Sequence, residues 1–351
     1  MTPTNLFTMK KYILPILFCL LLLGLPALSQ AKPKAKTPAP LQFHPNGEFK
    51  ILHFTDIHYI FGKEESPVAL DNLNKVIEAE KPDLIIITGD MIYGKPALEG
   101  ITDVMATVSK HGIPFCTTFG NHDDESGLSR SELYDIIQAT PNCVNPPRGE
   151  AASPDYTVEV KSSDGTRTAA VLYCLDSHAY AQVKGVGKYA WFTHDQIGWY
   201  RAKSAAYTEA NAGTPVPSFA FFHIPLPEYG QAIADPKTKV FGNRKEAGGE
   251  AKVNSGMFVN MKECGDIVGV FTGHDHDNDY ALDYYGICLC YGRFSGCSNV
   301  YNHLQNGGRV IILKEGARSF DSWIRERTGA KVQPFTYPQD FVFKKGENFN
   351  H

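Results

Sequence analysis

The sequence lacks several features that would place it in a specialised class of protein. Its 34 basic and 38 acidic residues give a formal net charge of −4, so the basic excess of a dedicated nucleic-acid binder is absent. There is no Cys-x-x-Cys pair, which argues against a zinc ribbon or a thioredoxin-type redox site. No repeat of the solenoid kind occurs. We therefore expect no nucleic-acid partner and no repeat architecture.

Composition is otherwise that of an ordinary globular protein. The chain has 351 residues, of which 43% are apolar and 21% charged, enough for one large α/β domain or two small ones. Among its eight cysteines, Cys116 and Cys174 fall in predicted core strands and are interpreted as packed thiols. The cysteines that leave room for a disulfide, with no pairing that the sequence decides, are Cys143, Cys264, Cys288, Cys290 and Cys297.

One long apolar run stands at the N-terminus. Lys10 and Lys11 precede a nearly continuous apolar stretch over 12–28, and small residues follow around Ser29 and Ala31. This pattern predicts a signal peptide over 1–31, and hence a protein that is exported to a periplasm or secreted. The alternative is an uncleaved membrane anchor, although the run is at the short end of the roughly 17–25 residues that span a bilayer. We expect membrane contact only before cleavage, and a flexible linker over 32–47 because lysine, proline and alanine dominate there.

Strands and helices alternate in the first half of the chain. Ser66-Pro67 predicts a helix start, with the serine as cap, and Ser129 with Glu132 forms a capping box that opens another helix. Such alternation is typical of parallel βαβ units, in which ligands bind at the carboxyl ends of the strands. The elements predicted here are strands over 49–55, 84–88 and 115–119 and helices from 67, over 98–110 and from 130.

The second half is predicted to contain two paired strands and then further strands separated by a helix. The paired strands cover 156–160 and 168–175, and a capping box at Thr193 and Gln196 starts a helix that runs to about residue 210. Further strands are expected over 218–222, 267–272, 287–291 and 309–313. We place the folded domain at 48–330 and a C-terminal tail at 331–351, because the last twenty residues show no clear element.

Metal-binding side chains follow five of the predicted strands. Each alone has an ordinary explanation, such as a helix cap, a turn residue or a buried histidine. Together they form a mixture of imidazole, carboxylate and amide that suits iron, manganese or zinc, and their number suits two ions better than one. The eight residues are Asp56, His58, Asp90, Asn121, His122, His223, His274 and His276.

In this order the motifs resemble those of the calcineurin-like metallophosphoesterases. The resemblance runs from Phe49 to Leu313 and rests on Asp-x-His, Gly-Asp, Gly-Asn-His-Asp, a strand-end His and Gly-His-x-His. The segments 223–229, 253–256 and 273–279 are most similar to the purple-acid-phosphatase-like branch, which includes short plant forms and fungal phosphatases. The resemblance implies a four-layer α/β/β/α sandwich.

The resemblance also implies a role for each position. One divalent or trivalent ion would be held by Asp56, His58, Asp90 and His276, and a second by Asn121, His223 and His274, with Asp90 bridging the two. His122 and Asp123 are the predicted catalytic pair, and His122 would face the substrate without binding metal. The candidate substrate-binding residues, from loops that could line the cleft, are Arg130, Asn254 and Arg293.

One position departs from the purple acid phosphatases proper. Those proteins have glycine where this chain has His58, and they bind ferric iron through a tyrosine that corresponds to Tyr93. This chain has both His58 and Tyr93, and two such large side chains would be crowded at one coordination position of the metal. We expect His58 to bind the metal and Tyr93 to pack nearby, so that the protein would not be purple.

The predicted activity is hydrolysis of phosphate esters by a metal-activated hydroxide, with His122 assisting the leaving group. A phosphomonoesterase acting on small phosphate esters or phosphoproteins is the first hypothesis. The alternatives are a phosphodiesterase acting on cyclic nucleotides, nucleotides or lipid-derived diesters, and a metal-binding module without turnover.

Overall fold

The computed structural model describes residues 40–342. The predicted signal peptide, the first part of the predicted linker and residues 343–351 lie outside this range. Within it, none of the helices combines the length and the apolar character needed to cross a membrane.

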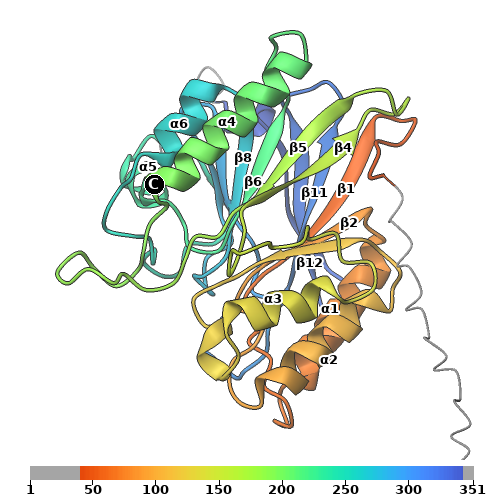
Figure 1. Ribbon diagram of the computed structural model, residues 1–351, viewed down its shortest axis with the longest axis vertical. Helices are drawn as coiled ribbons and strands as arrows, with labels where there is room; N and C mark the ends of the chain where they lie inside the picture. The colour runs from red at the N-terminus through yellow and green to blue at the C-terminus, as the bar shows by residue number, and fades with distance from the viewer. Residues whose placement is uncertain (1–39, 343–351) are drawn as a thin grey trace, which may run out of the picture. The chain divides into compact units, whose positions relative to one another are not determined.

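Two mixed β-sheets form the centre of the fold (Figure 1). The first has the strand order β13-β12-β11-β1-β2-β3 and the second the order β4-β5-β6-β8-β10-β9-β7. The strands of the first sheet are β1 (Glu48–Phe54), β2 (Leu84–Thr88), β3 (Phe115–Thr118), β11 (Gly307–Lys314), β12 (Phe320–Glu326) and β13 (Lys331–Tyr337). Those of the second are β4 (Tyr156–Lys161), β5 (Thr168–Cys174), β6 (Ser218–Phe221), β7 (Val240–Phe241), β8 (Ile267–Thr272), β9 (Ala281–Tyr284) and β10 (Ile287–Tyr291).

Helices cover the outer face of each sheet, which gives the predicted four layers (Figure 1). Against the first sheet lie α1 (Pro67–Glu80), α2 (Ala97–Ser109) and α3 (Arg130–Gln138). Against the second lie α4 (His194–Ala210), α5 (Pro227–Ala234) and α6 (Met257–Cys264). Two short 3₁₀ helices complete the elements, η1 (Asp123–Ser126) and η2 (Gln339–Phe341).

Strand β2 shows why both sheets are buried on both faces. Its residues Leu84 and Ile86 pack between the sheets, whereas Ile85 and Ile87 pack against the helices. Alternate side chains of a strand point to opposite faces, so a continuous apolar run is what a doubly covered strand requires. The apolar run that predicted β2 is therefore a direct consequence of the four-layer packing.

The parallel centres of the two sheets direct their carboxyl ends to one region. Strands β1, β2 and β3 are parallel neighbours in the first sheet, and β5, β6, β8 and β10 are parallel neighbours in the second. The predicted strand boundaries agree with the observed ones to within about two residues, and both predicted capping boxes are present. The ends of these strands carry the candidate metal ligands.

The capping role expected of Ser66 was wrong. Its side chain makes no bond to the backbone of α1. Instead Ser66 Oγ accepts hydrogen bonds from the backbone N–H of Ile60, at 3.1 Å, and from the amide of Asn299, at 2.7 Å. The hydroxyl thereby holds the loop between β1 and α1 in place. Because Asn299 lies far along the chain from Ser66, no local sequence pattern predicts this contact.

The first and last segments of the described range contribute more to the fold than expected. Phe43, in the predicted linker, is buried in the core between the sheets, and its N–H donates to the carbonyl of Lys161 at 2.9 Å. At the other end, β13 pairs with β12 within the predicted tail. Pro334 speaks against a strand in the sequence because proline has no backbone N–H to donate. However, β13 lies at the edge of its sheet, where the missing N–H removes no hydrogen bond between strands.

No disulfide forms among the described cysteines. All seven are free, and Cys116 and Cys174 pack together between the sheets with their sulfur atoms 3.8 Å apart, as predicted. The alternative of a disulfide among the other five cysteines is not realised.

Phe335→Ala tests whether β13 belongs to the core. Phe335 is 4% exposed and its ring contacts Phe320 and Phe341, so truncation should lower the free energy of unfolding by about 3–5 kcal/mol. Urea unfolding followed by circular dichroism measures this, with Val342→Ala, at an exposed position, as the control. Equal stability of the two variants would show that the segment is a dispensable tail.

Candidate metal centre

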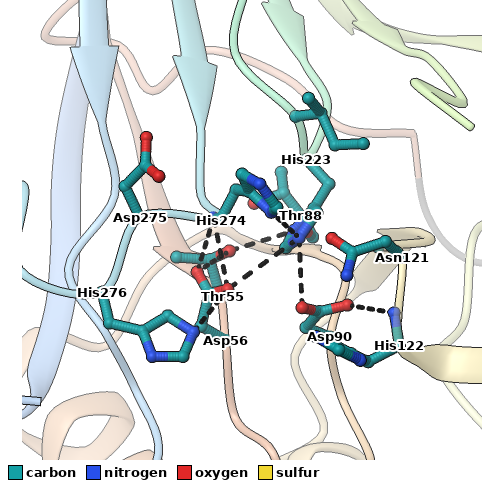
Figure 2. Close-up of polar contacts among 12 residues, drawn as sticks. Thr55, Asp56, Thr88, Asp90, Asn121, His122, His223, His274, Asp275 and His276 are labelled. Atoms are coloured by element: carbon teal, nitrogen blue, oxygen red, sulfur yellow. Dashed lines mark hydrogen bonds and ion pairs between the residues drawn. The ribbon is translucent and has the colours of Figure 1, made fainter. Parts of the chain in front are cut away.

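Six of the seven predicted metal ligands, all except His58, are labelled in Figure 2, where their side chains lie together at the ends of the two sheets. His58 belongs to the same cluster, because its Nε2 lies 3.1 Å from Nε2 of His276. Asp56 and His58 follow β1, Asp90 follows β2, and Asn121 follows β3, all from the first sheet. From the second sheet, His223 follows β6, and His274 and His276 follow β8. Each of the seven side chains is buried, with at most 8% of the residue exposed.

The backbone at these strand ends is held in an unusual conformation. Asp56, His58, Asp90 and His274 have positive φ angles of 54°, 45°, 49° and 79°. Residues other than glycine rarely occupy this left-handed region, at a cost of order 1–3 kcal/mol each, and such strain clusters at functional sites. Backbone hydrogen bonds hold it here, among them His58 N–H to Asp90 O at 2.9 Å.

Glycines in the motifs allow the loops to approach closely. A Cβ atom on Gly273 would overlap the hydroxyl of Thr55, and one on Gly120 would overlap the carboxylate of Asp90. Any larger residue would push apart loops that belong to different strands. The glycines next to the ligands are therefore part of the site's construction.

The ligands form two triads. In the first, made of Asp56, His58 and His276, the Nε2 atoms of the two histidines lie 3.1 Å apart, and Asp56 Oδ1 lies 3.6 Å from His276 Nε2. In the second, His223 Nε2 lies 3.2 Å from Asp90 Oδ2 and 3.3 Å from His274 Nδ1. Donor atoms that share an ion at bond lengths of about 2.0–2.2 Å are roughly 3–3.5 Å apart, so both triads have suitable spacing.

One oxygen connects the two triads. Asp90 Oδ2 lies 3.5 Å from Nε2 of His58 and 3.2 Å from Nε2 of His223, one histidine from each triad. The other oxygen, Oδ1, accepts the backbone N–H of His122 at 2.8 Å (Figure 2). Asp90 is thus placed where a bridging carboxylate would stand.

Hydrogen bonds prepare the histidines as ligands. Nδ1 of His223 donates to the carbonyl of Thr88 at 2.7 Å, and Nδ1 of His276 donates to the carbonyl of Tyr301 at 2.8 Å. Because a carbonyl only accepts, each ring keeps its proton on Nδ1, which leaves Nε2 as the atom that would bind an ion. Asn121 Oδ1 is buried with no hydrogen-bond partner, so an ion at this place would satisfy it.

Electrostatics favour cations at both triads. Burial by itself raises the pKa of Asp90, but attraction from His223 and His58 outweighs it and holds that pKa well below its usual value. Burial lowers the pKa of His223, yet the carboxylates of Asp90 and Asp56 raise it to about 9. Burial and repulsion from His223 lower the pKa of His274 to about 3, which leaves its ring neutral. His223 therefore also carries a proton on Nε2, directed at Asp90, and an ion bound there would displace that proton to give the carboxylate and imidazole donors of a divalent metal site.

His122 lies beside the triads and belongs to neither. Its side chain is 27% exposed, and its Nδ1 donates to Glu125 Oε2 at 2.5 Å. Its backbone is fixed by the bond to Asp90, so the ring has a defined place next to the cluster. Nε2 is the nitrogen left for a substrate.

Sequence reasoning missed two neighbours of His122. Glu125 Oε1 accepts from the hydroxyl of Tyr180 at 2.8 Å, and that hydroxyl accepts from the amide of Asn121 at 3.2 Å. Glu125 follows His122 by three residues, a spacing that could have suggested the pair because a short helix begins there. Tyr180 lies in the loop after β5, and only the fold brings it here.

Asp123 has a different position from the one its predicted role requires. It is fully buried, and its two oxygens accept the backbone N–H groups of Asp90, Met91 and Gly120 at 2.7–2.9 Å. Burial and repulsion from Asp90 raise its pKa to about 6. With both oxygens turned to the backbone, Asp123 positions Asp90 and does not face a substrate.

The three candidate substrate residues are dispersed. Arg130 lines a cavity that also includes Asn121, although its guanidinium already donates to Asp176 at 3.0 Å. Asn254 lines a separate small cavity, and its amide donates to Glu228 at 2.7 Å.

Arg293 is the residue for which the prediction fails. Only 2% of it is exposed, and its guanidinium pairs with Asp279 at 2.5 Å and Glu326 at 3.3 Å. A buried charge needs such partners, which gives Arg293 a structural role.

Tyr93 packs beside His58, as predicted. Its ring meets those of His58 and His122 edge to face, with centroid distances of 5.5 and 5.1 Å, and 37% of the residue is exposed.

Comparison with known proteins agrees with this geometry. The sequence model of the family described as "Calcineurin-like phosphoesterase" matches residues 49–278. "Probable inactive purple acid phosphatase 29" of Arabidopsis thaliana is 35% identical over 344 residues, which cover 88% of this chain and 85% of the relative. "Phosphatase DCR2" of Saccharomyces cerevisiae is 30% identical over 286 residues, covering 72% of this chain and 49% of that protein. Among solved structures, GAP50 of Plasmodium has the same fold, with a TM-score of 0.50 at 11% identity over 85% of this chain and 90% of that one.

Asp90→Ala tests the shared carboxylate. The wild-type protein should bind about two ions per chain, and the variant at most one, because the oxygen within reach of both triads is gone. Elemental analysis after metal loading and dialysis measures this. Asp135→Ala, which removes an exposed carboxylate on α3, is the matched control and should keep both ions. Two ions bound to Asp90→Ala would refute a bridging role.

Proposed function

Because the chain belongs to the calcineurin-like phosphoesterase family, we propose that it is a phosphomonoesterase that uses two metal ions. The observation that carries this proposal is Asp90 Oδ2, which lies within 3.5 Å of a histidine from each triad. Two buried triads joined by one carboxylate form a binuclear site, and His122 at its side adds an acid–base group.

The donor set limits the choice of ions. Imidazole nitrogen with carboxylate and amide oxygen suits iron, manganese or zinc. Bound at the two triads, such ions supply water activation and neutralisation of charge on the phosphoryl oxygens. Asp56, His58, Asp90 and His276 would hold one ion, and Asp90, Asn121, His223 and His274 the other.

The chain's own contribution to the reaction centres on His122. The oxygen of a water molecule that has given one proton to solvent bonds to phosphorus, the bond to the leaving oxygen breaks, and the leaving oxygen takes a proton from Nε2 of His122, which solvent then restores. Glu125 at Nδ1 fixes the ring orientation, because the hydrogen bond holds that nitrogen and leaves Nε2 free for the substrate. The Asp90 bond to the His122 backbone ties this acid to the metal centre.

The substrate and the location form the less specific part of the proposal. We propose a phosphorylated small molecule or protein as substrate, and an exported protein, in a periplasm or secreted, on the strength of the predicted signal peptide. A phosphodiesterase and a metal-binding module without turnover are the competing functions. The name of the plant relative, which calls it inactive, favours the module over the diesterase as a competitor.

Hydrolysis of p-nitrophenyl phosphate but not of bis-p-nitrophenyl phosphate with manganese supports the proposal. The reverse supports a diesterase, and no hydrolysis with any of the three metals supports the module.

His122→Ala and Glu125→Gln test the acid by changing the leaving group. For an alkyl phosphate, whose leaving oxygen needs a proton, His122→Ala should lower kcat by about 10²–10⁴-fold and Glu125→Gln by roughly 10–100-fold. For 2,4-dinitrophenyl phosphate, whose leaving group needs none, both losses should be several times smaller.

The controls for this test are Glu99→Gln, an exposed acid on α2 that should change neither rate, and Glu125→Asp, which should restore part of the loss. Equal losses on both esters would mean that the variants disturb the site in general, and His122 would not be the acid.

A further inference from the structure

A cavity of about 770 Å³ lies beside the metal centre. Its walls come from the segment after β3, with η1 and the start of α3, from the segment before β4, and from the loop that joins β5 to α4. This volume is within the range of small-molecule sites, which is about 300–1,000 Å³. Nothing in the proposed function accounts for it.

The position of the cavity identifies which part of a substrate it would hold. Asn121 and Glu125 both line it, and Glu125 is the group that holds His122 by Nδ1. His122 delivers its proton to the leaving oxygen, so the leaving group must extend along the side where His122 and Glu125 lie. The cavity therefore receives the alcohol part of the ester.

Much of the wall is apolar. Trp191, Tyr180, Val183 and several alanines contribute to it, and Tyr180 stacks on Tyr189 with ring centroids 6.0 Å apart. An aromatic or otherwise apolar leaving group would gain burial energy there, whereas a small polyol would gain little.

The charges around the cavity oppose an anionic leaving group. Three carboxylates line it, from Asp124, Glu125 and Asp176, with side-chain exposures of 37%, 40% and 8%. The guanidinium of Arg130 is engaged with Asp176 at 3.0 Å and Asp124 at 3.5 Å. The ammonium of Lys188 stands nearby, over the ring of Tyr189 at 4.8 Å and that of Tyr180 at 5.6 Å. With the protonated His122 at Glu125, three cations balance the three carboxylates, but the one arginine or lysine among the described lining residues, Arg130, is already paired with two of those carboxylates, so an anionic leaving group finds no free cation in the wall.

We infer that this cavity is a leaving-group site selective for phosphate monoesters of apolar or aromatic alcohols that are neutral or cationic. The inference rests on the proposed function, because it takes the leaving group's direction from the role of His122. It excludes esters whose alcohol part carries further carboxylates or phosphates.

Aryl phosphates that differ only in charge test the selectivity. The series is phenyl phosphate, 4-(aminomethyl)phenyl phosphate and 4-carboxyphenyl phosphate, and kcat/KM should be highest for the cationic ester and lowest for the anionic one, by about 3–10-fold per charge. Asp124→Asn should reduce this spread and Lys188→Met should increase it, since they change the cavity's charge in opposite directions. Glu263→Gln, which removes an acid paired with Arg201 on α6, should leave the spread unchanged.

Trp191→Ala tests the apolar wall. The ratio of kcat/KM for phenyl phosphate to that for glycerol phosphate should fall several-fold relative to the wild-type ratio, because the aromatic contact is lost. An unchanged ratio, or a charge spread that Asp124→Asn and Lys188→Met do not move, would overturn the inference while leaving phosphatase activity standing.

Binding of the corresponding phosphonates separates the two proposals. These analogues cannot be hydrolysed, and titration calorimetry on the metal-loaded protein should show the same charge order in Kd. A charge order in binding without hydrolysis of any ester would refute the proposed function alone. Equal Kd values for the three phosphonates would refute the cavity's selectivity.

Discussion

The carboxylate of Asp90 is the constraint on which the site depends. Its backbone N–H is fixed by Asp123, its Oδ1 binds the backbone of His122, and its Oδ2 reaches a histidine from each sheet. In the proposed function, metal ligation, bridging of the two ions and orientation of His122 therefore all depend on this one side chain. The four-layer fold serves this arrangement, because only two sheets with aligned carboxyl ends can bring ligands from both sides to one carboxylate.

The strained strand ends show how the fold supports this geometry. Four of the ligands occupy the left-handed backbone region, which residues other than glycine rarely adopt. Gly120 and Gly273 allow neighbouring loops to come close to these strand ends. The buried apolar strands behind them supply the stability that offsets this cost. Four of the ten described non-glycine residues with a positive φ are candidate ligands, and their backbone is held by hydrogen bonds such as His58 N–H to Asp90 O, which fits a site built to hold ions.

The sequence predicted the parts of the structure with local causes. Buried strands such as β2 and β8 can be recognised in the sequence as apolar runs, and the ligands at their ends belong to motifs of only a few consecutive residues. It failed where the cause lies far along the chain: Tyr180 reaches Glu125 from another loop, and Arg293 is buried by its pairing with Asp279. Strand β13 forms because it can pair with β12, and this pairing cannot be predicted from the residues around Pro334.

The bridging position of Asp90 can be observed in a crystal structure of the metal-loaded protein, with anomalous scattering collected at the edges of iron, manganese and zinc. Two anomalous peaks about 3.5–4 Å apart are expected, with the carboxylate of Asp90 bonded to both. A single peak, or two peaks of which only one contacts Asp90, would contradict the bridging position.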